Sequence, residues 1–258
     1  MLRLYHVLLG VILLAVLTPL GFVKYALPYL SSNNSSNNKL QLTQAQANTA
    51  QKQTQTTSSN LQPNEGNIWK NILGKTAVPP GWRVAACDGN TPLLCVSSDK
   101  KILGTVEMGV YPLENLPNFQ QMLNKAGISP NFNVNYQSPS YQTQLASALK
   151  LWVADHYGVL EKDRRNVYGD SIVFSAQSPQ QAPVGKLQGM RYGFSGIKRK
   201  GGLQEQHLGY VAFDGKALYV ITTAFDPASE TGKFDQLENF QRFEPFLFIT
   251  VQGMNLPR

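Results

Sequence analysis

The sequence predicts an α+β domain in which an antiparallel β-sheet is covered by helices, preceded by one transmembrane helix. Three observations lead to this prediction. Residues 7–23 carry no charge, apolar and polar side chains alternate between residues 103 and 111, and Asp214-Gly215 joins two apolar runs. An uncharged run of about 20 residues is long enough to cross a bilayer. Period-2 alternation is typical of a half-buried strand, and Asp-Gly is a strong hairpin signal.

The apolar run is expected to anchor the chain in a membrane. Extended back to residue 4, it covers residues 4–23, about 30 Å of helix, and only His6 interrupts it. Arg3 precedes the run and favours a cytoplasmic N-terminus. A cleaved signal peptide is the alternative, although the residues after the run lack the small-residue pattern of a good cleavage site. Both interpretations predict a periplasmic or thylakoid-lumenal domain, and the first makes this a single-pass membrane protein.

The predicted organisation of the chain is an anchor at residues 1–30, a tether at 31–66 and a folded domain at 67–258. Ser, Asn, Gln and Thr dominate the tether, and such a segment cannot bury enough apolar surface to offset its ordering entropy. It is therefore expected to be disordered. The net charge of +7 arises partly from basic residues ahead of the domain, so nucleic-acid binding is not expected.

Within the domain, a β-meander, two helices, antiparallel strands and a final helix are expected in that order. The middle helix is the most strongly patterned, because Leu145, Leu149 and Val153 share one face. Gly169 follows it, where a C-terminal cap belongs. The expected strands are 82–87, 93–97, 103–111, 171–176, 187–198, 205–213 and 216–225, and the expected helices are a short one near Trp69 and Ile72, then 116–125, 141–166 and 234–253.

This order resembles the PsbP-like family, which includes the extrinsic photosystem II subunit and extracytoplasmic relatives. The resemblance covers residues 67–258. It depends on a Gly-Trp strand after a Pro-rich entry (78–82), the long middle helix, a Gly-rich strand (189–196), the aromatic strand 217–225 after the Asp-Gly turn, and a final helix with Phe240 and Phe243. It implies an α/β/α sandwich and an accessory role beside a membrane protein complex. The Asn- and Gln-rich composition of the tether also resembles that of cyanobacterial proteins. The family's docking and metal-binding residues have no match here that can be assigned residue by residue.

Three groups of residues are candidates for function. Cys87 and Cys95 flank a predicted turn, which suits a cross-hairpin disulfide in an exported domain; free thiols or a redox or metal role are the alternatives. Lys198, Arg199 and Lys200 form a basic hairpin tip, either a solvated turn or a contact with acidic headgroups or an acidic partner. Phe240, Phe243 and Phe246 could line an apolar cavity between the final helix and the sheet.

No catalytic, cofactor or metal motif is expected. His156 follows Asp155 on a helix, where neighbours point to different faces, and His207 lies on a strand. Residues 193–196 are not a G-x-S-x-G elbow, and Asp226 lacks calcium-loop spacing. The favoured function is a membrane-anchored extracytoplasmic module that binds or helps to assemble a membrane protein complex, with a photosynthetic complex as one candidate. A small-molecule or lipid-binding carrier is the alternative, and a cell-envelope hydrolase is a distant third.

Overall fold

The computed structural model describes residues 66–129 and 135–257, which belong to the compact unit Thr57–Arg258. The predicted anchor and almost all of the predicted tether lie outside the described residues. Within the described ranges, no helix is both long enough and apolar enough to cross a membrane.

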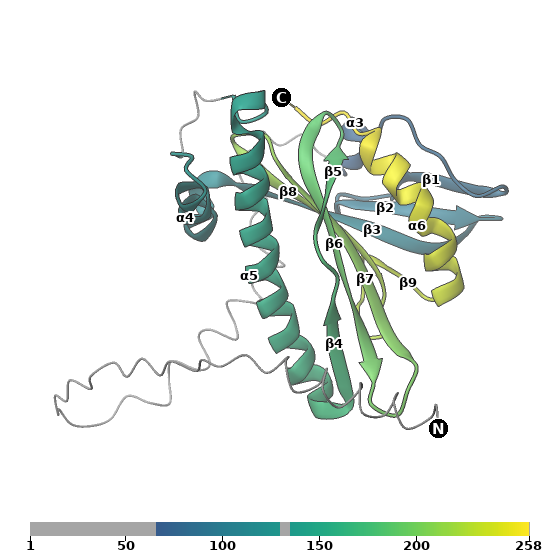
Figure 1. Cartoon of the computed structure of the whole chain (residues 1–258). Helices are drawn as coiled ribbons and strands as arrows, with labels where there is room; N and C mark the ends of the chain where they lie inside the picture. The colour runs from purple at the N-terminus through teal and green to yellow at the C-terminus, as the bar shows by residue number, and fades with distance from the viewer. Residues whose placement is uncertain (1–65, 130–134, 258) are drawn as a thin grey trace, which may run out of the picture. The chain divides into compact units, whose positions relative to one another are not determined.

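Nine described strands form one sheet, which confirms the predicted α+β class (Figure 1). The order is β1-β2-β3-β9-β8-β7-β6-β4; β5 also pairs with β6, and β3 also pairs with β8. Every pairing is antiparallel except that of β8 with β9. The strands are β1 (Trp82–Ala86), β2 (Leu93–Ser98), β3 (Lys101–Pro112), β4 (Ile172–Ala176), β5 (Gln180–Val184), β6 (Leu187–Lys198), β7 (Leu203–Phe213), β8 (Ala217–Phe225) and β9 (Lys233–Phe234).

Helices cover both faces of this sheet. α4 (Pro117–Lys125) and α5 (Gln142–Tyr168) pack on one face, and α3 (Trp69–Ile72) and α6 (Leu237–Gln252) pack on the other (Figure 1). Three short 3₁₀ turns, η1 (Leu113–Asn115), η2 (Pro139–Tyr141) and η3 (Gly169–Ser171), lie next to these elements. Gly169 ends α5 with a φ of 57°, and its N–H bonds to the carbonyl of Arg165, as expected of a glycine cap.

The central strands carry side chains into two separate cores. Tyr210 and Ala212 of β7 join the core beneath α6, whereas Val211 and Phe213 join the core beneath α5. Successive side chains of a strand point to opposite faces, so a sheet buried on both sides needs apolar residues at consecutive positions. This explains why the second half of the chain contains long apolar runs rather than strict alternation.

Several boundaries differ from the sequence-based prediction by one to three residues, and two strands were not predicted. The final helix begins at Leu237 and not at Phe234, because Phe234 belongs to β9 and pairs with Gly104 of β3. β5 and β9 were not predicted: β5 begins with two glutamines and contains Pro183, and β9 has only two residues. A proline removes a ladder donor, so the local sequence of β5 argues against a strand, and its pairing with β6 overrides that preference.

The predicted disulfide between Cys87 and Cys95 is confirmed, with an S–S distance of 2.03 Å. It closes the hairpin between β1 and β2, and the loop of this hairpin contacts the first residues of the domain. The buried Asn67 amide donates to the carbonyls of Cys87 and Leu93, at 3.0 and 2.6 Å. Trp69 Nε1 donates to the carbonyl of Pro92 at 3.0 Å. The hairpin therefore fixes the point at which the chain enters the sheet.

Candidate functional site

A network of four ionisable side chains lies beneath the C-terminal half of α5. Arg164 of α5 donates through one nitrogen, Nη1, to Glu205 Oε2 at 2.8 Å and to Asp226 Oδ2 at 3.0 Å. His207 Nε2 lies 3.1 Å from Glu205 Oε2 and 3.4 Å from Asp226 Oδ2. Both carboxylate side chains are fully buried, and those of Arg164 and His207 are 13% and 20% exposed. The network joins α5, β7 and the residue that follows β8.

The electrostatics of this cluster favour a charge-balanced set. Burial alone would lower the pKa of His207, but the hydrogen bonds and charges of Asp226 and Glu205 outweigh it and raise the pKa. Burial alone would raise the pKa of Asp226, but hydrogen bonds from His207, the N–H of Ala228 and Ser229 hold it well below its ordinary value. Arg164 and His207 thus lie where they can offset the two buried carboxylates, and Arg164 also pairs with the half-exposed Asp163 at 2.9 Å.

Packing around the network fixes the imidazole. The ring of His207 stacks on Phe194, its cross-strand neighbour, with centroids 4.2 Å apart and planes 10° apart. Phe194 stacks in turn on Phe174 at 4.5 Å. Gly196 lies opposite Glu205, and a Cβ there would approach Glu205 Cγ and Oε1 to 2.7 Å. Glycine at position 196 therefore makes the space that the buried carboxylate occupies.

Glu205, His207 and Asp226 form a three-ligand set of the type that can bind a cation, with one donor atom each and all within 4.8 Å. Arg164 already donates into the same two carboxylate oxygens. A metal ion would have to displace this guanidinium, and the site would then carry an additional buried charge. The geometry therefore favours an ionic clamp between α5 and the sheet.

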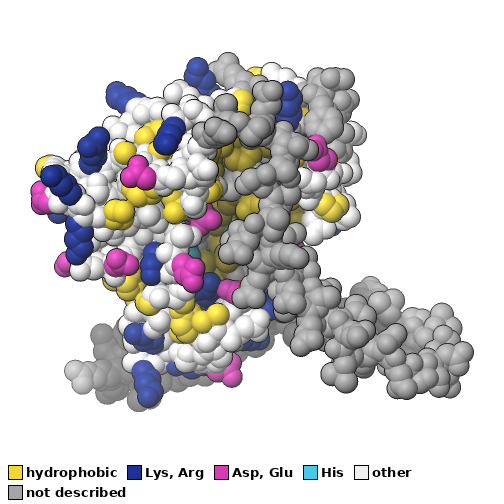
Figure 2. All heavy atoms as spheres, turned by 180° about the vertical axis from the view of Figure 1, so that it is seen from behind, with side chains coloured by type: hydrophobic (Ala, Val, Ile, Leu, Met, Phe, Trp, Pro, Cys, Tyr) yellow, Lys and Arg dark blue, Asp and Glu magenta, His cyan; other side chains and the backbone are white. Residues whose placement is uncertain are grey.

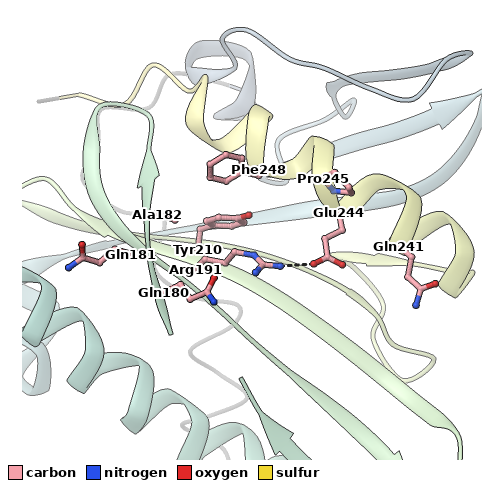
Figure 3. Close-up of a pocket in the computed structure, with 9 residues that line it drawn as sticks. All are labelled: Gln180, Gln181, Ala182, Arg191, Tyr210, Gln241, Glu244, Pro245 and Phe248. Carbon is pink, nitrogen blue, oxygen red and sulfur yellow. Dashed lines mark hydrogen bonds and ion pairs between the residues drawn. The ribbon is translucent and has the colours of Figure 1, made fainter. Parts of the chain in front are cut away.

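A second candidate site is a pocket of about 360 Å³ between α6 and the sheet (Figure 3). Its floor contains three cross-strand neighbours, Gln180 of β5, Arg191 of β6 and Tyr210 of β7. Arg191 Nη2 donates to Glu244 Oε1 of α6 at 2.5 Å, and the two side chains are 29% and 30% exposed. The pocket thus combines a half-buried ion pair with an open mouth.

The predicted basic tip lies at the opposite end of β6 from this pocket. Lys198, Arg199 and Lys200 are exposed. The backbone N–H and the side chain of Arg199 both donate to carbonyls of η3, those of Ser171 and Asp170, so the tip is held rather than free. On the face of the molecule that Figure 2 shows, basic and acidic side chains are interspersed, and the visible part carries no continuous basic surface.

The structure puts the predicted phenylalanines in different surroundings. Phe240 and Phe243 are 1% exposed and pack on Phe234 of β9, with centroid distances of 6.0 and 5.5 Å. Phe246 is partly buried against the same core. The pocket described above lies on another stripe of α6 and includes none of these three. The structure shows these phenylalanines packed in the core. A cavity lined by them stays a prediction.

Sequence reasoning missed the ionic network. Glu205 and His207 are two residues apart on a predicted strand, so period 2 puts both on one face and could have revealed the pair. Asp226 and Arg164 are distant in sequence and carry no such signal. His156 was expected to form no dyad with Asp155; its ring stacks on Trp152, and burial lowers its pKa to about 4.

Comparisons with known proteins add little to this description. No family model matches the chain, and no curated protein matches it. Among solved structures, the solution structure of cyanobacterial PsbP (CyanoP) from Synechocystis sp. PCC 6803 is similar at 7% sequence identity and a TM-score of 0.34. The similarity covers 79% of this chain and 99% of that one. It is a weak likeness at the level of the fold, and no function is drawn from it.

Proposed function

We propose that this chain is a membrane-anchored, extracytoplasmic accessory module that docks on a membrane protein complex through the basic end of its sheet. Its domain is taken to have the PsbP-like arrangement that the element order resembles, and its anchor and tether are those predicted at residues 1–30 and 31–66. The observation that carries the docking role is an exposed apolar pair beside the basic tip.

The docking surface consists of Val173, Ile197, Lys198, Arg199 and Lys200. Val173 of β4 and Ile197 of β6 are cross-strand partners, 47% and 41% exposed. Lys198 follows Ile197 directly and pairs with Ile172. Apolar side chains that remain exposed at the same end of the sheet as the lysines match a partner surface with an apolar centre and an acidic rim. The hydrogen bonds of Arg199 to η3 hold the surface in shape before any partner arrives.

Site-specific photocrosslinking in the native membrane tests this proposal. A photoreactive residue at position 198 should crosslink to an integral membrane protein, and the same residue at position 125 of α4 should not. Lys125 is a suitable control because it is exposed and lies on a different element. Crosslinks from position 198 to lipid alone, or equal products from both positions, would contradict docking on a protein complex.

A second candidate function is that of a small-molecule carrier. The pocket between α6 and the sheet is the observation that favours it, because its Arg191–Glu244 pair is accessible from solvent. Native mass spectrometry of the purified full-length chain should then reveal a retained ligand. Loss of that ligand in an Arg191→Gln variant would assign it to this pocket.

A further inference from the structure

We infer that the pocket between α6 and the sheet binds a neutral, polyhydroxylated molecule about the size of one sugar ring. This inference rests on the carrier candidate and is independent of the docking role. It begins with how the pocket is built. Gln241, Glu244, Pro245 and Phe248 occur at spacings of three, four and seven residues, so they form one stripe of α6 facing the floor (Figure 3).

The floor contains a buried hydroxyl beside the ion pair. Tyr210 is 1% exposed, and Arg191 is the donor that its hydroxyl meets, whereas the hydroxyl's own proton has no acceptor among the described residues. It lies close enough to Arg191 for the guanidinium to oppose the rise in pKa that burial causes. A ligand oxygen that accepted this proton would complete the hydrogen bonding of the buried hydroxyl.

The wall of the pocket is formed by α6. Pro245 lies inside α6 and has no N–H, so the carbonyl of Gln241 lacks its usual donor four residues later. Phe248 of the same stripe is 37% exposed, unusual for a large apolar ring on a packed helix. A hydroxyl, an ion pair and an aromatic ring thus line one small space, which is the composition of a ligand site.

The ion pair indicates the charge of the ligand. Arg191 presents donors next to the acceptor oxygens of Glu244, only 2.5 Å away. Neighbouring hydroxyl groups match this arrangement, because each hydroxyl can both donate and accept. An anionic ligand would face the carboxylate of Glu244, and a cationic one would face the guanidinium of Arg191. A neutral molecule avoids both repulsions.

The size of the pocket limits the ligand. Its volume of about 360 Å³ is at the small end of the range of about 300–1,000 Å³ typical of ligand pockets. The mouth remains open beside the exposed amide side chains of Gln180 and Gln241, which can bind further hydroxyl groups. A single ring with several hydroxyls therefore fits better than a long acyl chain.

Three sugars of similar shape and different charge provide the test: glucose, glucuronate and glucosamine. Saturation-transfer NMR on the full-length chain in detergent should show transfer to glucose and weaker transfer to both charged analogues. The double variant Arg191→Gln/Glu244→Gln keeps the site neutral and removes the charged hydrogen bonds, and should weaken glucose binding about ten-fold. Tyr210→Phe should weaken it less.

The control variant Arg165→Gln removes an ion pair with Glu161 that is exposed and distant from the pocket. Its glucose signal should equal that of the unchanged chain, and thermal unfolding should show that all variants are folded. Equal transfer to all three sugars, transfer to none, or glucose binding that survives the double variant would overturn the inference. A different ligand retained in native mass spectrometry would then preserve the carrier role while excluding this ligand class.

Discussion

Arg164 is the residue that neutralises the two carboxylates beneath α5. Its nitrogen contacts both Glu205 and Asp226, whose side chains have no exposed surface. The neighbouring Arg165 also forms an ion pair, with Glu161, but those side chains are 70% and 50% exposed. Removing one member of a buried ion pair leaves an uncompensated charge, whereas a solvated pair contributes little. Two adjacent arginines therefore have very different roles.

An Arg164→Ala variant is expected to lose about 3–5 kcal/mol of unfolding free energy at neutral pH. Arg165→Ala should lose less than about 1 kcal/mol, because water screens its pair. Urea denaturation followed by circular dichroism measures both values. Similar losses for the two variants would mean that the clamp is not a source of stability.

The two described histidines should have opposite pH dependence. The raised pKa of His207 means that the folded state holds its proton more tightly than the unfolded state. Its contribution to stability is complete below about pH 6.5 and is lost as pH rises through the folded pKa. The pKa of His156 is lowered to about 4, so its contribution is complete above about pH 6.5 and is lost as pH falls toward 4.

Urea unfolding from pH 4 to pH 9 tests this difference. The stability gap between the unchanged chain and His207→Gln should shrink as pH rises above 6.5. The gap for His156→Gln should shrink as pH falls below 6.5. Parallel curves for either variant would show that the corresponding imidazole does not titrate as its surroundings indicate.

At the scale of elements, the β1–β2 hairpin holds the entry of the domain. The disulfide closes this hairpin, and its loop carbonyls accept hydrogen bonds from Asn67 and Trp69. The loop is short, so the entropic stabilisation by the disulfide is modest in itself. Its additional role is to hold the carbonyls in position for the residues that precede α3.

Replacing both cysteines, Cys87→Ser with Cys95→Ser, should lower the unfolding free energy by about 2–3 kcal/mol. A reducing agent should lower the midpoint of the unchanged chain by a similar amount and leave the double variant unaffected. Denaturant titrations with and without reductant measure this. A reductant effect that persists in the double variant would assign the loss to something other than this bond.

At the scale of the whole molecule, the docking surface predicts a dependence on charge. Lys198→Glu/Lys200→Glu should reduce recovery of the partner complex in mild detergent by ten-fold or more, since two attractive contacts of about 1 kcal/mol each become repulsive. The matched variant Lys125→Glu/Lys216→Glu changes charge equally, at two exposed lysines on α4 and the β7–β8 turn. Tagged co-purification, with recovery measured by immunoblot, compares them.

Rising salt should weaken the same contact, because the Debye length falls from about 10 Å at 0.1 M to about 3 Å at 1 M. Recovery of the complex at both salt concentrations provides the measurement. Equal recovery of both charge-reversed variants, or binding that does not respond to salt, would place the interface elsewhere on the domain.

Local sequence patterns were enough to predict the α+β class, most strands, the long middle helix and the disulfide pair. These features are encoded locally, since apolar periodicity and turn residues act over a few positions. The strand Leu187–Lys198 was predicted with both ends correct, and the Asp214-Gly215 hairpin lies where expected. The predicted anchor and tether are local inferences of the same kind.

Contacts between residues distant in sequence follow from the folded arrangement alone. Arg164, Glu205 and Asp226 are far apart in sequence, and only the packing of α5 across β7 and β8 brings them within hydrogen-bonding distance. The pocket beside α6 likewise depends on strand register, which sets Gln180, Arg191 and Tyr210 side by side. Register and helix docking follow from the burial of two whole cores, and no short segment of the chain contains that information.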